Sequence, residues 1–222
     1  MNFMQWLSSL DELLYEVMSW VLFLPVTLWR VLTGPLSMMA YADSQLGLPD
    51  TEQYQEALSP PLFLALCLLL AHTIELALGD TNALVTSRHG LAALIKDDSS
   101  LLLLRLLLFA IFPLAMALRS VRSRKLALDR STLRLPFYAQ CYPTAAFALA
   151  ISIGGSASQA HLPALRTAGS AIFVIAPLIY LLVEARWFAV LGGGLLRGFG
   201  SALLAFAQGL VAFLAIALIV VH

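Results

Sequence analysis

Charged residues are scarce in this 222-residue sequence, and their scarcity excludes an ordinary soluble protein. Asp, Glu, Lys and Arg make up only 12% of the chain, whereas hydrophobic residues make up 60% and the mean hydropathy is +0.87. A soluble domain carries roughly 25% charged residues. The composition therefore predicts an all-α membrane protein. The thirteen basic and thirteen acidic residues balance, so we expect no nucleic-acid partner.

Cysteine and histidine are also rare, and we expect no cofactor, no metal and no enzymatic activity. Cys67 and Cys141 lie in apolar runs, which is typical of small buried hydrophobes rather than of a disulfide framework. His72 and Glu75 form an H-x-x-E pair, but helical metal sites use the order E-x-x-H on two helices, with further glutamates. No serine or cysteine nucleophile stands beside a base.

Basic residues are absent from the first 29 positions, so the chain does not begin with the basic region of a cleavable secretion signal. Ser9 and Glu12 fit a capping box, which predicts a helix start at Ser9. One face of this helix is apolar and the other is acidic. Its apolar residues are Leu10, Leu13, Leu14, Val17, Met18 and Val21, and the acidic ones are Asp11, Glu12 and Glu16. Helices that bind anionic lipid usually carry Lys and Arg, so we expect this helix to lie against protein or against its own bundle.

Residues 19–36 are apolar but are interrupted by Pro25, Arg30 and the pair Gly34-Pro35. We interpret this stretch as half-inserted or interfacial, with a sixth span over residues 17–41 as the alternative. A polar connection is expected over residues 36–59. The sequence thus divides into an N-terminal amphipathic region, 1–59, and a transmembrane domain, 60–222.

Five apolar runs of about 20 residues, the length that crosses a bilayer, predict a helical bundle of five spans. These runs cover residues 60–79, 99–118, 135–154, 167–185 and 199–222. A run of glycines precedes the fifth span and contains the spacing Gly194-xxx-Gly198. This run is either a flexible connector or a site of close helix approach.

One connection between spans is strongly basic, and it predicts the orientation of the chain. Six of the thirteen basic residues lie between positions 119 and 134, and short loops rich in Lys and Arg stay in the cytoplasm. We therefore expect a cytoplasmic N-terminus and an external C-terminus, in a bacterial inner membrane. Arg119, Arg122, Arg124 and Lys125 either bind anionic lipid headgroups or serve only to orient the chain.

Several polar residues lie inside the predicted spans. Counted from the external ends at 1.5 Å per residue, Glu75, His72 and Arg105 lie at depths of about 6, 10 and 9 Å. Since ionisable groups in spans usually pair, we predict an ion pair between Glu75 and Arg105 with His72 beside it. Gln140, Tyr142 and Gln208 are further buried candidates, which packing or interhelical hydrogen bonds explain as well as a ligand or a pore.

Two short motifs resemble those of the Yip superfamily of five-span membrane proteins. LTGP at residues 32–35 is similar to the Gly-Pro motif before the first span of that family, and Tyr142-Pro143 falls where the family carries a tyrosine and a proline. The acidic residue usual before Gly-Pro is missing. The resemblance implies five spans and a role in membrane assembly or transport.

Two functions follow from these observations. The first is a non-enzymatic integral membrane protein that assembles with or supports other membrane proteins, or associates with itself. The alternative is a small permease or channel subunit that uses the buried polar residues of its spans.

Overall fold

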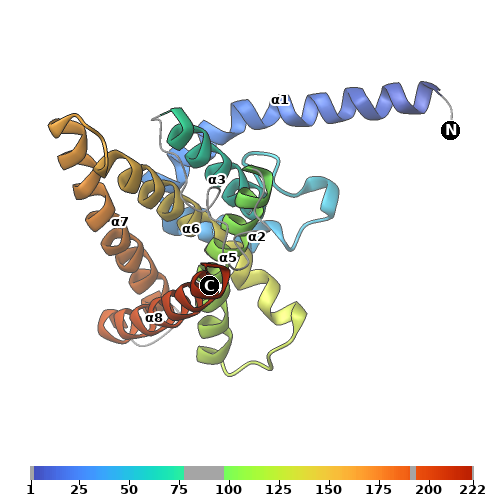
Figure 1. The fold of residues 1–222 in the computed structure, drawn as a ribbon. Coiled ribbons are helices and arrows are strands. Elements are labelled where there is room, and N and C mark those ends of the chain that lie inside the picture. The colour runs from blue at the N-terminus through green and yellow to red at the C-terminus, as the bar shows by residue number, and fades with distance from the viewer. Residues whose placement is uncertain (1–2, 78–97, 191–193, 222) are drawn as a thin grey trace.

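The computed structural model describes residues 3–77, 98–190 and 194–221, and in these residues the regular structure is entirely helical (Figure 1). The all-α prediction is therefore confirmed. The seven α-helices of the described residues are α1 (Phe3–Thr33), α2 (Pro35–Gln45), α3 (Pro60–Ala77), α5 (Asp98–Ser123), α6 (Arg130–Ser158), α7 (Pro163–Val190) and α8 (Gly194–Val221). A short 3-10 helix, Asp50–Glu52, lies between α2 and α3.

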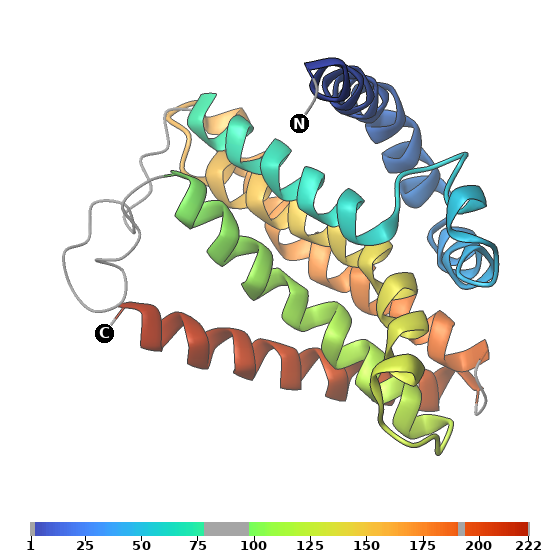
Figure 2. The same ribbon diagram turned by 90° about the vertical axis from the view of Figure 1, so that its right-hand side faces the viewer.

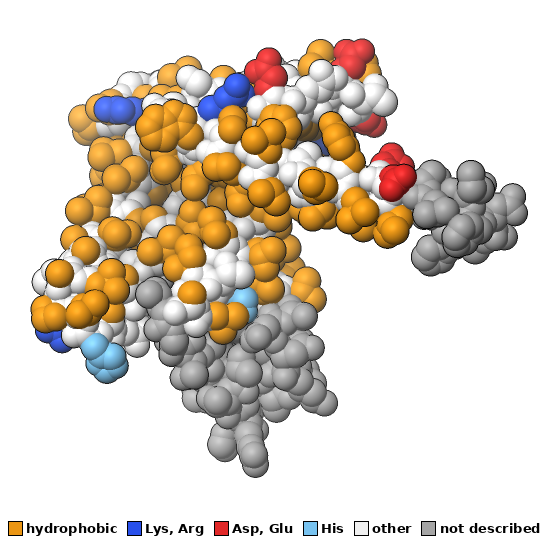
Figure 3. All heavy atoms as spheres, turned by 90° about the horizontal axis from the view of Figure 1, so that it is seen from above, with side chains coloured by type: hydrophobic (Ala, Val, Ile, Leu, Met, Phe, Trp, Pro, Cys, Tyr) orange, Lys and Arg blue, Asp and Glu red, His pale blue; other side chains and the backbone are white. Residues whose placement is uncertain are grey.

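Five of these helices are long and apolar enough to cross a membrane, but they are not the five that the sequence predicts. The qualifying segments are Leu10–Thr33, Pro60–Ala77, Leu102–Ser123, Pro163–Val190 and Gly194–Ile219. The N-terminal helix α1 is thus among them and α6, the third predicted span, is not. Hydrophobic side chains are spread over the described part of the face seen in Figure 3, as expected of a protein in contact with lipid.

Helix α6 is the central helix of the bundle. It packs against α2, α3, α5 and α7, and Gln140, Tyr142 and Thr144 on it are completely buried. A helix whose neighbours are protein on several sides can carry polar residues that lipid would not tolerate. Its position therefore explains how α6 can be less apolar than α3, α5 and α7 around it.

Helix α1 runs across the bundle helices rather than alongside them, and its N-terminal part projects away from the bundle (Figures 1 and 2). The predicted helix start at Ser9 is wrong, because the helix already begins at Phe3 and continues through Pro25 to Thr33. From Leu10 to Met18 every residue is exposed. In its second half, Thr27 and Val31 are buried against the bundle.

The connection over residues 36–59 is more ordered than predicted, because helix α2 fills its first part. Gly34 precedes α2, and Pro35 takes the first helical position, where the missing N–H costs nothing. The end of the connection is held at Leu58. Its N–H donates to the Thr27 hydroxyl at 3.1 Å, and its carbonyl accepts from the Tyr142 hydroxyl at 2.7 Å. Residues of α2 share one buried core with α3 and α6. The division at residue 59 stays a prediction.

The basic segment 119–134 is mostly helical rather than a loop. Helix α5 continues to Ser123 and α6 begins at Arg130, so only six residues connect them. Asp129 caps α6: its carboxylate accepts from the backbone N–H groups of Ser131 and Thr132, both at 2.8 Å. These bonds satisfy donors at the helix start that have no partner within the helix. The predicted loop 80–98 lies almost entirely outside the described residues.

Glycines allow α7 to approach both of its neighbours closely. A Cβ atom on Gly154 would lie 2.8 Å from the backbone nitrogen of Phe173, and one on Gly169 would collide with the backbone of Ala157 and Ser158. Where α7 meets α8, a Cβ on Gly198 would collide with the carbonyl of Ala185. Gly198 therefore belongs to a close helix contact, whereas a Cβ on Gly194 would meet no described atom within 4 Å, and Gly194 starts α8 with φ +78°.

Candidate functional site: two buried carboxyl groups

The first buried carboxyl group belongs to Glu75 on α3, and it is paired. Its Oε2 lies 2.5 Å from Nη1 of Arg105 on α5, and the two side chains are 8% and 19% exposed. The predicted ion pair is therefore present. His72, one turn earlier on α3, is also buried. The partner charge offsets part of the cost of taking each group out of water.

The helical period places these groups on the inner face of α3. Cys67, Leu68, Ala71, His72 and Glu75 are buried. In contrast, Leu69, Thr73 and Leu76 on the opposite side are exposed. Two polar side chains three residues apart point the same way on a helix. The sequence pattern therefore directs His72 and Glu75 toward the bundle.

The second buried carboxyl group belongs to Glu184 on α7, and the sequence analysis missed it. Glu184 is completely buried, and neither of its carboxyl oxygens accepts a hydrogen bond of good geometry from a described residue, although the Gln140 amide interacts with it as a donor. Its polar neighbour is the side-chain amide of Gln140 on α6. The amide nitrogen and oxygen of Gln140 are also buried and complete no hydrogen bond among the described residues.

A second polar pair lies one helical turn from the first along the α6–α7 contact. The hydroxyl groups of Thr144 and Tyr180 are 3.3 Å apart and buried. Thr144 follows Gln140 by four residues and Tyr180 precedes Glu184 by four, so the antiparallel helices place the two pairs at successive turns. Together, Gln140, Thr144, Tyr180 and Glu184 form what we call the α6–α7 polar cluster.

The two carboxyl groups lie near the C-terminal ends of α3 and α7, and these two helix ends are at opposite ends of the bundle (Figure 2). Glu75 is near the end of α3 and Arg105 near the start of α5, whereas Glu184 is about 9 Å from the end of α7 and Gln140 about 15 Å from the start of α6 at 1.5 Å per residue. The α6–α7 polar cluster is thus on the side of the basic α5–α6 connection.

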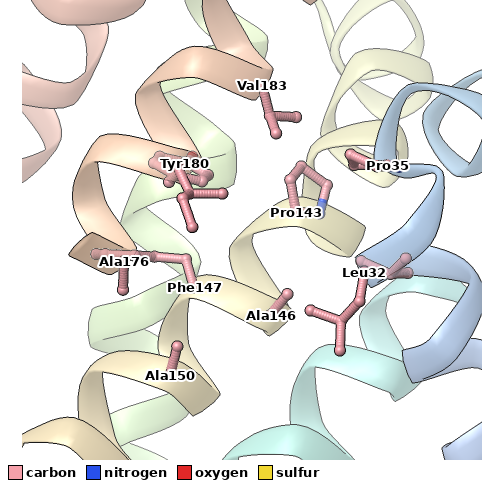
Figure 4. Close-up of a pocket in the computed structure, with 11 residues that line it drawn as sticks. Leu32, Pro35, Pro143, Ala146, Phe147, Ala150, Ala176, Tyr180 and Val183 are labelled. Atoms are coloured by element: carbon pink, nitrogen blue, oxygen red, sulfur yellow. The ribbon is translucent and has the colours of Figure 1, made fainter. Parts of the chain in front are cut away.

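An apolar groove of about 130 Å³ adjoins the α6–α7 polar cluster. Figure 4 shows Tyr180 and Val183 of α7 on one side of it, Pro143 of α6 in the middle, and Leu32 and Pro35 on the other side. The groove therefore reaches Tyr180, one turn from Glu184. It is lined by apolar side chains of α1, α2, α6 and α7.

The remaining predicted site residues have varied surroundings. Tyr142 is buried against Phe63, with ring centroids 5.8 Å apart, and its bond to Leu58 gives it a structural role. Gln208 on α8 is exposed on the surface of the bundle rather than buried as predicted. The rotation of α8 about its axis decides which of its faces meets the bundle, and a lone glutamine in an apolar run does not reveal it.

Of the four candidate lipid-binding residues, three are exposed: Arg122, Arg124 and Lys125. Arg119 instead donates to the Ser201 hydroxyl of α8 at 3.3 Å and is partly buried. Arg124 also interacts electrostatically with Asp43 of α2. Burial raises the pKa of Asp43, and the positive charge of Arg124 offsets part of this rise. The basic segment is therefore partly committed to contacts within the protein.

The sequence gives only a weak indication that Glu184 is buried. The fourth span was expected to end at residue 185, which places Glu184 at the membrane surface, but α7 continues to Val190. The spacing of Gln140 and Thr144, matched by that of Tyr180 and Glu184, is consistent with facing polar pairs. It becomes informative only once α6 and α7 are known to pack together.

Within the described residues, no three side chains of His, Cys, Asp or Glu lie together as metal ligands would. Comparisons with protein-family models, with curated proteins and with solved structures find no match to this chain. The resemblance to the Yip superfamily therefore rests on the two short motifs and the number of spans.

Proposed function

We propose that this protein is a non-enzymatic integral membrane protein that assembles with another membrane protein through α1. The observation that carries the proposal is the exposed apolar face of the projecting part of α1. Leu13, Met18 and Val21 on this face are 60%, 72% and 75% exposed. A helix with one apolar face gains stability by covering that face.

The proposed topology places α3, α5, α6, α7 and α8 across a bacterial inner membrane, with α1 along its cytoplasmic surface. Two observations support it: α1 runs across the other helices, and α6 has protein neighbours on several sides. The basic segment between α5 and α6 then faces the cytoplasm, where the exposed Arg122, Arg124 and Lys125 can meet anionic headgroups. The N-terminus is cytoplasmic and the C-terminus external.

The charges of α1 favour a protein as its partner over a lipid surface. Its first half carries Asp11, Glu12 and Glu16 and no basic residue, and these carboxylates repel anionic headgroups. The partner expected for this helix is a membrane protein with an apolar groove bordered by Lys or Arg. An apolar stripe seated in such a groove is a common mode of helix recognition.

Site-specific photo-crosslinking in native membranes tests this function. A photoreactive residue at Leu14 should form an adduct of one discrete mass with a different protein. The substitution Leu13→Ser, which removes a neighbouring apolar side chain of the same face, should reduce that adduct. The matched control is Leu204, an exposed residue of α8, which should give lipid adducts only. Lipid adducts alone at Leu14 would contradict the proposal, and an adduct of the chain with itself would replace the partner by a second copy.

A second candidate, a small permease or channel subunit, is favoured by the buried carboxyl groups. Ionisable residues inside membrane helices often mark the paths of ions or substrates. Glu75, however, already has Arg105 as its partner, and the groove beside the α6–α7 polar cluster is lined by neither His72 nor Glu75. Glu184 is the residue that supports this candidate.

A further inference from the structure

Glu184 is the one completely buried carboxyl group among the described residues that has no cationic partner there. An ionised carboxylate inside a protein needs a paired charge or several hydrogen-bond donors, and without them it takes up a proton instead. Glu75 meets this requirement through Arg105. Neither oxygen of Glu184 completes a hydrogen bond of good geometry with a described residue, and the one donor that interacts with it is the neutral amide of Gln140.

We propose that Glu184 is a reversible proton-binding site, occupied in the arrangement described, with Gln140 as the polar group that faces it. The carboxyl group takes one proton from water and returns it to water, so no other reactant is needed. The inference concerns the α6–α7 contact and does not depend on docking through α1.

The other titratable groups around Glu184 do not supply a countercharge. On α7 itself, Tyr180 lies one turn away, and its hydroxyl meets Thr144. On α6 the group that interacts with Glu184 is the neutral amide of Gln140. The thiol of Cys141, also on α6, interacts electrostatically with Tyr180 instead. Among the described residues of α2 and α8, the other helices packed on α7, no charged side chain acts on Glu184.

Prolines lie inside both helices of the α6–α7 contact. Pro136 and Pro143 flank Gln140 on α6, and Pro177 precedes Tyr180 on α7. A proline inside a helix removes a backbone hydrogen bond and is a common site of bending. Tyr180 is the member of the polar cluster that also lines the apolar groove (Figure 4).

Infrared spectroscopy of the full chain, reconstituted in lipid vesicles, tests this site directly. At pH 7 the wild type should show the C=O stretching band of a protonated carboxyl group, and alkaline titration should remove it. Glu184→Gln should lack the band at pH 7, whereas Glu75→Gln should retain it. A band that persists in Glu184→Gln, or the absence of a band in the wild type, would overturn the proposal.

Two further variants and one control keep the test decisive if Glu184→Gln folds poorly. Glu184→Asp keeps an acid at this position and should retain a protonated carboxyl band. Gln140→Leu should shift the frequency of the band, because the amide faces the carboxyl group. Gln208→Leu removes an exposed glutamine of α8 and should leave the frequency unchanged. Equal shifts in the two glutamine variants would contradict the assignment to the α6–α7 contact.

Discussion

Glu75 and Glu184 are buried acids in one helical bundle, yet their neighbours differ. Glu75 contacts the guanidinium group of Arg105, whereas Glu184 faces the neutral amide of Gln140. The comparison shows two ways in which a membrane bundle can hold an acid. One keeps the charge and supplies its opposite, and the other, as we propose, neutralises the acid with a proton.

The largest expected effect comes from breaking the Glu75–Arg105 pair. Glu75→Gln leaves the Arg105 charge without its partner, and removing one member of a buried pair costs about 3–5 kcal/mol. Because Arg105 is 19% exposed, we expect a loss of about 2–3 kcal/mol in the free energy of unfolding. Chemical denaturation in a mild detergent measures it.

The double variant sharpens this prediction. Glu75→Gln combined with Arg105→Gln replaces both charges, so its loss should be smaller than the sum of the two single losses. Strict additivity would show that the two residues are not energetic partners.

A smaller effect is expected at the unpaired acid. Glu184→Gln replaces a neutral acid by an amide of similar shape, so the free energy of unfolding at pH 7 should change by less than about 1 kcal/mol. The same denaturation experiment compares it with Glu75→Gln. A loss as large as that of Glu75→Gln would mean that Glu184 is ionised and held by a partner, and the contrast between the two acids would disappear.

The smallest effect is expected at Asp129, an exposed acid with which the buried acids Glu75 and Glu184 can be compared. The side chain of Ser131 and the backbone N–H of Thr132 donate to its carboxylate and lower its pKa below the usual 3.8. Its contribution to stability is therefore present above pH 3.8 and is lost as the pH falls through the lower folded-state value. Asp129→Ala should slightly lower the melting temperature at pH 7.

The pH dependence and a conservative variant check the role of Asp129 as a cap. The difference between the wild type and Asp129→Ala should shrink in strong acid, where the carboxylate is protonated. Asp129→Asn should behave much like the wild type at pH 7, because asparagine also caps helices well. An Asn variant as unstable as the Ala variant would indicate that the charge matters more than the cap.

The two buried acids also differ in how far the sequence could predict them. Glu75 and Arg105 lie at similar depths in consecutive predicted spans, so a count of residues along each helix was sufficient to pair them. The facing of Gln140 and Glu184 depends on how α6 and α7 are aligned. That alignment is fixed in part by the close approach at Gly154 and Gly169, which no pattern within either helix reveals.

The arrangement of α1 shows the same limit. Its amphipathic pattern was visible in the sequence, but its length was not, since the helix begins before the predicted cap and continues through Pro25. Its second half buries Thr27 and Val31, while its first half projects from the bundle. Which part of an apolar helix meets protein depends on where the other helices end.

The sequence by itself determined that this is an all-α protein with apolar helices long enough to cross a membrane. Composition and the lengths of apolar runs can be read from the sequence without knowing which segments pack together. Only the tertiary structure decided that Glu184, unlike Glu75, is fully buried with no cation beside it among the described residues. The state of a buried acid depends on side chains from other helices, and their positions follow from packing between helices rather than from the local sequence.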